Sequence, residues 1–282
     1  MNATGPSTHL KIVATSARIE EHSDVLTAMH ALDGRVIIVT GAAQGIGQAA
    51  ADLLLALGAA VVVVDVNQPA LEAWAADKLE DRVMVIAGSV TDAAFAGRVV
   101  ADAGARFGDI HGLVNNAGIV RAAMIDKMSA EQWQAVIDVN LTGAFHMLQA
   151  VGRATIARVK TGWSGPVAIV NVSSDAGRRG TVGQINYGAA KAGVFGLTMS
   201  AAREWARYGI RVNSVAFGVV ETPMTDTIRG EKFRDKMLDL IPMGRFAAPA
   251  EVVPPICFLL SDAASCVTGQ NLSVNGGYTI GF

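Results

Sequence analysis

With 282 residues, 51% of them hydrophobic and 17% charged, the chain can bury one large core and has the size of a single α/β domain. Its net charge of −2 creates no field that would gather polyanions, which argues against nucleic acid or an acidic membrane surface as the main partner. We therefore expect a small-molecule partner.

Cysteine content and hydropathy narrow the class of protein further. The two cysteines, Cys257 and Cys266, lack metal-ligand spacing and are too few for a disulfide framework, so we expect no metal site and a reducing, cytoplasmic location. The chain has no run of the about 18 apolar residues that a membrane helix needs, and we expect no membrane span.

Residues 1–31 mix Ser, Thr, Glu, Asp and His without a basic start, an apolar block or a small-residue cleavage site, so they do not resemble a secretory signal. We interpret residues 1–31 as a flexible N-terminal arm and residues 32–282 as the single folded domain. Met29 stands just before the first convincing strand, and we hypothesise that the native product starts there.

Strands and helices are expected to alternate along the rest of the chain. Uninterrupted β-branched runs are typical of strands buried on both faces of a parallel sheet, and the helical stretches between them are long enough for crossovers. The expected strands are 36–39, 61–64, 83–86, 112–115, 167–172, 211–216 and 272–274. With about six helices they predict a single-domain, doubly wound, Rossmann-like α/β fold with a parallel seven-stranded sheet, which binds ligands at the carboxyl ends of its strands.

A glycine-rich turn, Thr-Gly-Ala-Ala-Gln-Gly-Ile-Gly at 40–47, lies between the first strand and the first helix. Its glycines permit a tight turn and close approach of the backbone to a pyrophosphate at the helix N-terminus. Asp65 ends the second strand 18 residues after Gly47, where its carboxylate can accept from both ribose hydroxyls. This carboxylate would repel a 2′-phosphate and Gln44 offers no positive charge, so NAD(H) is favoured over NADP(H) as the cofactor.

Tyr187, Lys191 and Ser174 form the candidate catalytic group. Tyr187 and Lys191 are four residues apart, which places them on one face of a helix, and Ser174 lies 13 residues upstream at a strand end. A free tyrosine, with a pKa of about 10, is a poor base at neutral pH. We expect the Lys191 cation to lower the pKa of the Tyr187 phenol, and the trio predicts proton-transfer chemistry.

Two other features leave alternatives open. The segment 223–249 is spaced for one or two amphipathic helices, which form either a substrate lid or ordinary packing; its apolar residues are Met224, Ile228, Phe233, Met237 and Leu240. Arg178 and Arg179 follow the strand that carries Ser174, and they either meet an anionic substrate tail or are solvated loop arginines.

Five motifs occur in order along the chain: Thr-Gly-x-x-x-Gly-Ile-Gly at 40–47, Asn-Asn-Ala-Gly at 115–118, Asn140, Ser174, and Tyr187 with Lys191. Together they resemble the short-chain dehydrogenase/reductase family, and the resemblance covers residues 32–282. Within the family, the segments 115–121, 183–187 and 274–277 are similar to bacterial 3-oxoacyl-(acyl carrier protein) reductases.

The resemblance implies roles for these residues. Ser174, Tyr187, Lys191 and Asn140 would be catalytic, with Asn140 holding a water that links Lys191 to solvent; Asn140 could instead be a buried amide bonded to backbone. The predicted cofactor-binding residues are Gly41, Gln44, Gly45, Ile46, Gly47, Asp65, Val66, Ser89, Val90, Asn116, Ala117, Gly118, Tyr187, Lys191, Val220 and Thr222. The family also implies a homotetramer, with the helices of Asn140 and Tyr187 at one interface and residues 278–282 near another.

Three features depart from the family pattern, the last of them shared by two positions. Ser89 stands where an Asp commonly meets the adenine amine, so that either adenine contact is weaker or Asp92 shifts in. Phe217 replaces the proline of the usual Pro-Gly after the sixth strand and brings a bulky ring toward the nicotinamide and substrate. Asp65, and Tyr208 in place of a second docking arginine, differ from the carrier-protein reductases, which generally use NADPH, so the sequence leaves acyl carrier protein open as a partner.

The sequence thus predicts an NAD(H)-dependent enzyme that interconverts a ketone and a secondary alcohol, with a 3-oxoacyl thioester as the leading substrate. An NAD-dependent alcohol, polyol or steroid dehydrogenase is the alternative within the enzyme class. A dinucleotide-binding sensor without turnover is the alternative from another class, since fold alone permits it.

Overall fold

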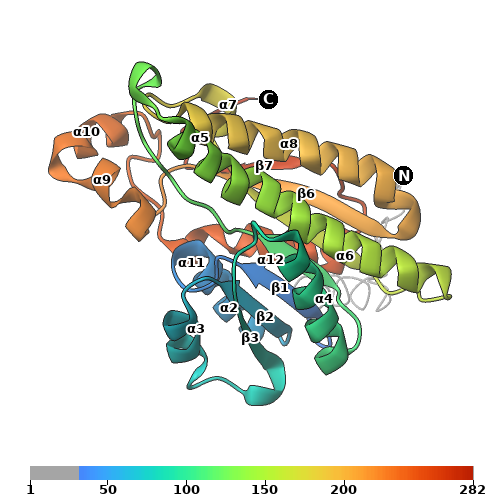
Figure 1. Cartoon of the computed structure of the whole chain (residues 1–282). Coiled ribbons are helices and arrows are strands. Elements are labelled where there is room, and N and C mark those ends of the chain that lie inside the picture. Colours follow the sequence, from blue (N-terminus) through green and yellow to red (C-terminus); the bar gives the residue numbers. More distant parts are fainter. Residues whose placement is uncertain (1–31, 282) are drawn as a thin grey trace, which may run out of the picture.

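The computed structural model describes residues 32–281, so the predicted N-terminal arm, the proposed start at Met29 and the last residue of the expected C-terminal interface lie outside the described residues. One seven-stranded sheet forms the centre, in the order β3-β2-β1-β4-β5-β6-β7, and every neighbouring pair is parallel (Figure 1). The strands are β1 Val36–Thr40, β2 Ala60–Asp65, β3 Val83–Ala87, β4 Gly112–Asn115, β5 Val167–Ser174, β6 Ile210–Phe217 and β7 Asn271–Val274. All seven predicted strands are confirmed, several with one or two more residues at an end.

Helices connect the strands as crossovers. They are α2 Gly45–Ala56, α3 Gln68–Ala75, α4 Ala93–Phe107, α5 Ala130–Ile137, α6 Gly143–Lys160, α7 Ala176–Arg179, α8 Ile185–Trp205, α9 Asp226–Arg229, α10 Glu231–Asp239, α11 Pro249–Val252 and α12 Pro254–Leu260. The expected number of about six is exceeded because the chain also makes single-turn helices such as α7 and α9. None of the helices in residues 32–281 has the length and apolar character that crossing a membrane requires.

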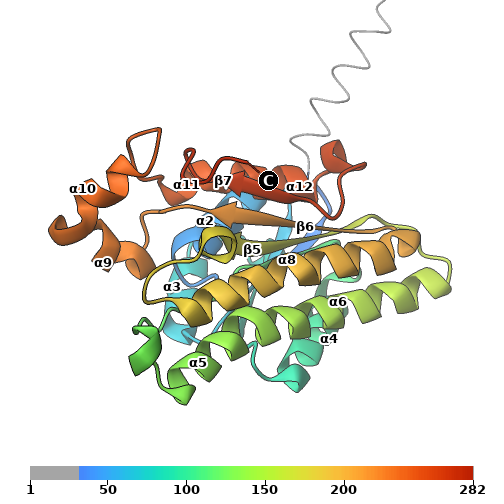
Figure 2. The same ribbon diagram turned by 90° about the horizontal axis from the view of Figure 1, so that it is seen from above.

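Both faces of the sheet are covered. Core residues of α2, α3 and α12 pack on one face, and those of α4, α6 and α8 pack on the other (Figure 2). All five residues of β1 are buried, which explains why its sequence shows an uninterrupted apolar run instead of alternation. The doubly wound prediction is confirmed.

The strand order changes direction next to β1. The chain moves from β1 outward to β2 and β3, and then returns to place β4 on the opposite side of β1. Connections that leave neighbouring strands in opposite directions open a crevice at the carboxyl ends of those strands. The candidate site lies there.

Buried polar side chains hold the strands and helices around this crevice in register. The Asn115 side-chain amide donates to the Ala144 carbonyl of α6 and to the Asn171 side-chain oxygen, each at 2.9 Å. The Asn171 amide in turn donates to the Thr198 hydroxyl on α8 at 2.9 Å. Because buried polar groups are costly without partners, this chain of bonds sets how β4 and β5 sit against the helix that carries Tyr187.

Segment 223–249 extends from one end of the molecule as α9 and α10 (Figure 1). Ile228 and Met237 pack against a small separate core, whereas Phe233 and Leu240 are 38% and 42% exposed. Two short helices with an apolar side are therefore confirmed. Part of the segment is ordinary packing, and its first residues also line the crevice, as described below.

Candidate active site

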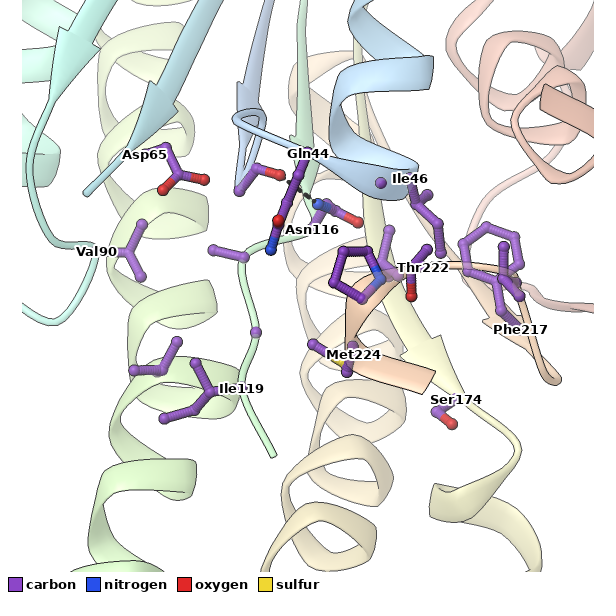
Figure 3. Close-up of a pocket in the computed structure, with 18 of the residues that line it drawn as sticks. Gln44, Ile46, Asp65, Val90, Asn116, Ile119, Ser174, Phe217, Thr222 and Met224 are labelled. Atoms are coloured by element: carbon purple, nitrogen blue, oxygen red, sulfur yellow. Dashed lines mark hydrogen bonds between the residues drawn. The ribbon is translucent and has the colours of Figure 1, made fainter. Parts of the chain in front are cut away.

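A cleft of about 450 Å³ opens at the carboxyl ends of the central strands (Figure 3). The residues around it are Gly41, Gln44, Gly45, Ile46, Val64, Asp65, Val66, Asn67, Gly88, Ser89, Val90, Asn116, Ala117, Gly118, Ile119, Val139, Val172, Ser173, Ser174, Tyr187, Lys191, Phe217, Gly218, Val220, Thr222, Pro223, Met224 and Thr225. Every predicted cofactor-binding residue lines this cleft except Gly47, and every predicted catalytic residue except Asn140.

The glycine-rich turn between β1 and α2 has no room for a side chain at its glycine positions. Gly41 and Gly45 adopt φ of +66° and +59°, which favour glycine. A Cβ at Gly47 would lie 2.2 Å from the Gly41 carbonyl oxygen and 2.5 Å from the Asn116 side-chain nitrogen. Gln44, at the N-cap of α2, makes no side-chain capping bond, so the turn leaves this helix N-terminus able to receive an anion. Gly47 therefore shapes the turn from behind instead of lining the cleft.

The Asn-Asn-Ala-Gly motif supports the turn. The Asn116 side-chain amide donates to the carbonyls of Thr40 and Gly41 at 3.1 and 3.0 Å. The backbone N–H groups of Asn116 and Ala117 donate to the Thr40 hydroxyl at 3.0 and 3.1 Å. These bonds join the end of β4 to the end of β1 and hold the floor of the cleft rigid.

Asp65, at the end of β2, faces the same cleft (Figure 3). Its carboxylate accepts from the backbone N–H of Ala43 at 3.2 Å and of Asn67 at 3.0 Å, which orients both oxygens. Among the described residues that line the cleft, Lys191 is the only cation. The Asp65 end thus presents a carboxylate with no lining Lys or Arg that would attract a phosphate.

The two residues considered for the adenine end behave differently. Ser89 lines the cleft and its hydroxyl is 2.8 Å from that of Thr91. The Asp92 carboxylate instead caps α4 by accepting from the Ala94 N–H at 2.8 Å, and it faces Arg98 at 3.4 Å. Asp92 does not line the cleft, so it does not take the place of the acid that usually meets the adenine.

Tyr187 and Lys191 project from one face of α8 toward Ser174 at the end of β5. The Lys191 ammonium donates to the Val172 carbonyl at 2.8 Å and lies 5.7 Å from the centre of the Tyr187 ring. The Ser174 side chain is close enough to the Tyr187 phenol to lower the pKa of that phenol. The neighbouring Ser173 hydroxyl donates to the Lys191 carbonyl at 2.8 Å and is buried. The contacts therefore separate the two serines, and Ser174 is the one that faces the phenol.

Burial governs the titration of this pair. It lowers the pKa of Lys191 to about 8, and it raises the pKa of the Tyr187 phenol, against the effect of the Ser174 side chain, which lowers it. We expected the Lys191 cation to lower the pKa of Tyr187, but in this structure desolvation outweighs any such effect. A phenol with a raised pKa keeps its proton at neutral pH and can donate it.

Asn140 lies on the π-helical turn η3 Asp138–Thr142, between α5 and α6. Its side-chain amide donates to the carbonyls of Ile119 and Val136, both at 2.9 Å, which matches the plain structural alternative. Its side-chain oxygen is buried and has no hydrogen-bond partner among residues 32–281. That free acceptor lies directly behind Gly118, where an added Cβ would be 2.6 Å away.

Arg178 and Arg179 neither line the cleft nor stand free. Arg178 donates to the Ser273 hydroxyl and to the Asn271 carbonyl, each at 2.8 Å. Arg179 donates to the Tyr278 carbonyl at 3.0 Å and stacks over the Tyr278 ring. Arg178 is therefore a half-buried residue that binds α7 to the C-terminal segment, whereas Arg179 is exposed, as the solvated alternative expected, and also contacts that segment.

Several lining residues had no clear sequence signal. Ile119 and Val139 add an apolar wall. Pro223 and Thr225 flank Met224, which the sequence already marks as part of a possible substrate lid; Figure 3 labels Ile119 and Met224. Apart from Met224, their positions directly after the Asn-Asn-Ala-Gly motif, beside Asn140 and after Thr222 were the only available hints. The Phe217 ring is 4% exposed and belongs to the core under β6, so the cleft meets only a small part of it.

A parallel sheet with a glycine-rich first crossover, an acid at the end of β2, and a serine, tyrosine and lysine at the end of β5 defines a dinucleotide-dependent oxidoreductase. A family model described as enoyl-(acyl carrier protein) reductase matches residues 41–279. The chain belongs to the short-chain dehydrogenase/reductase family and is an oxidoreductase that acts on CH–OH and C=O groups. The family implies a nicotinamide dinucleotide cofactor, and the turn before α2, whose glycines let the backbone approach closely, fits its diphosphate.

Relatives within the family cover nearly the whole described chain. The chain is 44% identical over 251 residues to the 3-oxoacyl-[acyl-carrier-protein] reductase FabG of Thermotoga maritima, covering 88% of this chain and 99% of that protein. It is 39% identical over 251 residues to the D-threitol dehydrogenase of Mycolicibacterium smegmatis, covering 88% and 94%. A crystal structure from Brucella melitensis, described as a short-chain dehydrogenase/reductase and glucose/ribitol dehydrogenase, superposes with a TM-score of 0.82 at 35% identity, covering 88% and 98%.

Proposed function

We propose that the protein is an NAD(H)-dependent reductase of 3-oxoacyl thioesters, working in the cytoplasm, with the reverse oxidation of a secondary alcohol as the same reaction run backward. The observation that carries the proposal is the convergence of Ser174, Tyr187 and Lys191 at one end of the cleft. The substrate class is supported by the 44% identity to a 3-oxoacyl-[acyl-carrier-protein] reductase over 88% of the chain.

Each side chain has a task that its contacts suit. Tyr187 donates its proton to the carbonyl oxygen of the substrate, since its raised pKa keeps the phenol protonated. Ser174 bonds to the same oxygen and orients it. Lys191 supplies positive charge beneath the phenol. The Asn140 side-chain oxygen accepts a hydrogen bond from the water that links Lys191 to solvent. The hydride comes from the bound nicotinamide dinucleotide.

Tyr187→Phe tests the acid assignment. Positioned acid catalysis is worth about 10²- to 10⁴-fold, so the variant should retain less than about a hundredth of the turnover of an acetoacetyl thioester, followed by NADH absorbance. Tyr208→Phe, in the helical turn before β6, is the matched control and should keep full activity, because Tyr208 packs against the core away from the cleft. Retention of more than about a tenth of the rate by Tyr187→Phe would remove Tyr187 from its role.

The choice of NAD over NADP rests on Asp65. Its fixed carboxylate suits ribose hydroxyls and opposes a 2′-phosphate, and the cleft offers no arginine or lysine near that end. We expect Asp65→Ser to raise the ratio of kcat/KM for NADPH over that for NADH at least about tenfold. An unchanged ratio would show that Asp65 does not select the cofactor.

A polyol or alcohol dehydrogenase is the second candidate. It is favoured by Asp65, because the carrier-protein reductases generally use NADPH, and by the 39% identity to a D-threitol dehydrogenase. A panel of acyl thioesters, ketones and polyols, assayed with both cofactors, separates the two. Cofactor binding without turnover on that panel would instead support the sensor alternative.

Assembly and carrier-protein docking are separate proposals. We propose a homotetramer, which sedimentation of the purified protein tests. Acyl carrier protein stays an open partner, and a comparison of kcat/KM for carrier-linked and coenzyme A-linked substrates tests it: equal values would indicate that the carrier protein is not recognised.

A further inference from the structure

Asp175 is a buried acid next to Ser174 that the proposed mechanism does not use. It follows β5 directly, is 1% exposed, and does not line the cleft. Its carboxylate points toward the segment after β7 instead, where its Oδ2 accepts from the Asn275 side-chain amide at 2.8 Å. Burying a carboxylate costs free energy unless it has polar partners, so the groups that contact Asp175 indicate its role.

The polar groups around Asp175 come from α7 and from the segment after β7. Asn275 also donates to the Thr279 carbonyl at 3.1 Å, and its own side-chain oxygen accepts from the Gly277 N–H at 2.9 Å. Burial raises the pKa of the Asp175 carboxyl and outweighs the Asn275 amide and Arg178, which both favour its ionised form. The C-terminal segment is thus folded around the Asp175 carboxylate.

The arginines of α7 strengthen the same junction. Arg178 donates to the Asn271 carbonyl and the Ser273 hydroxyl, and Arg179 donates to the Tyr278 carbonyl. The single helical turn after Ser174 is therefore bonded along its length to residues 271–279. None of these bonds touches the cleft.

The junction reaches Ser174 through the backbone. The Asp175 N–H donates to the Phe217 carbonyl at the end of β6 at 3.1 Å, and the Ala176 N–H donates to the Ser174 hydroxyl oxygen at 3.2 Å. The hydroxyl that faces Tyr187 is consequently held by the first peptide of the turn that Asp175 anchors. A shift of that turn would move the Ser174 oxygen away from the phenol.

We propose that Asp175 is a positioning residue, whose bond to Asn275 of the C-terminal segment fixes the turn after β5 and with it the Ser174 hydroxyl. The inference rests on the role that the proposed function gives to Ser174. It adds that turnover depends on residues 271–279. These residues do not line the cleft, and they influence Ser174 only through the bond between Asp175 and Asn275.

A double-mutant cycle tests the link. Asp175→Ala should lower kcat for the thioester about tenfold while the dissociation constant of NADH, measured by titration calorimetry, stays within about twofold, because Asp175 does not line the cleft. In the Ser174→Ala background the same change should have no further effect on kcat. Asp175→Asn, which keeps an acceptor for Asn275, should restore at least half of the lost activity.

The outcomes are distinct. Equal losses of kcat in both backgrounds, or no loss in either, would overturn the proposal, because a general structural defect does not depend on Ser174. If Asp175→Ala does not fold, Asn275→Ala run through the same cycle decides by the same criteria. Asp262→Ala, which removes an exposed acid paired with Arg35 at the other end of the strands, is the control. Full activity of Ser174→Ala alone would refute the proposed role of Ser174, and not the placement by Asp175.

Discussion

Lys191→Met removes a charge from a side chain that is 3% exposed, and it should stabilise the protein while abolishing its activity. Burial lowers the pKa of Lys191 from 10.5 to about 8. Each pKa unit corresponds to about 1.4 kcal/mol, so keeping the charge in the folded protein at pH 7 costs about 3 kcal/mol. Loss of the hydrogen bond to the Val172 carbonyl offsets about 1 kcal/mol of the gain. We expect the free energy of unfolding to rise by about 2 kcal/mol at pH 7.

The stability difference between the wild type and Lys191→Met should shrink as the pH rises. Above about pH 8 the folded protein loses the Lys191 proton, whereas the unfolded chain keeps it up to 10.5. The unfolded state then binds more protons, so the wild-type protein becomes more stable as the pH rises through this window. From pH 7 to pH 9 the wild type should gain about 1 kcal/mol from Lys191, and the advantage of Lys191→Met should fall from about 2 to about 1 kcal/mol.

Urea unfolding at pH 7 and pH 9, at one protein concentration and without cofactor, measures both quantities, provided that the slopes with urea agree. Lys160→Met, at the exposed end of α6, is the control and should change the free energy of unfolding by less than about 0.5 kcal/mol at either pH. An advantage of Lys191→Met that is equal at the two pH values, or a variant less stable than the wild type at pH 7, would refute the reasoning.

Two further substitutions test the cleft and its support. Gly47→Ala should weaken NADH binding at least about tenfold in titration calorimetry, since its Cβ would lie 2.2 Å from the Gly41 carbonyl oxygen; Gly104→Ala in α4, with open space at that position, should bind normally. Asn171→Leu should lower the free energy of unfolding by about 2 to 4 kcal/mol, because it leaves the buried Asn115 amide with one partner fewer. A Tm within about 2 °C of the wild type would contradict the second expectation.

Much of the fold was predictable because the five inner strands are buried on both faces, which demands continuous apolar runs that are visible in the sequence. The glycines at 41, 45 and 47 were equally readable, since only their lack of a side chain allows the turn. The spacing of Tyr187 and Lys191 follows from helix geometry alone, and both side chains line the cleft as expected.

The misjudged residues all depend on what packs against them. Arg178 looks like a loop arginine until the C-terminal segment is placed over α7. Asp92 could serve the adenine or cap a helix, and the path of α4 decides for the cap. The pKa of Tyr187 moves upward because its phenol is buried, and no spacing rule reveals how much of a side chain its neighbours will cover.

The order of apolar runs, glycines and the Tyr-Lys pair already determined the class of fold, the end of the sheet where ligands bind and the chemistry to expect, because these depend on local periodicity and on residue type. Tertiary structure alone decided which serine faces the phenol, what the buried Asp175 contacts, and in which direction the two central pKa values move. Asp175 and Asn275 are 100 residues apart, and only the folding of β7 alongside β6 brings them within a hydrogen bond.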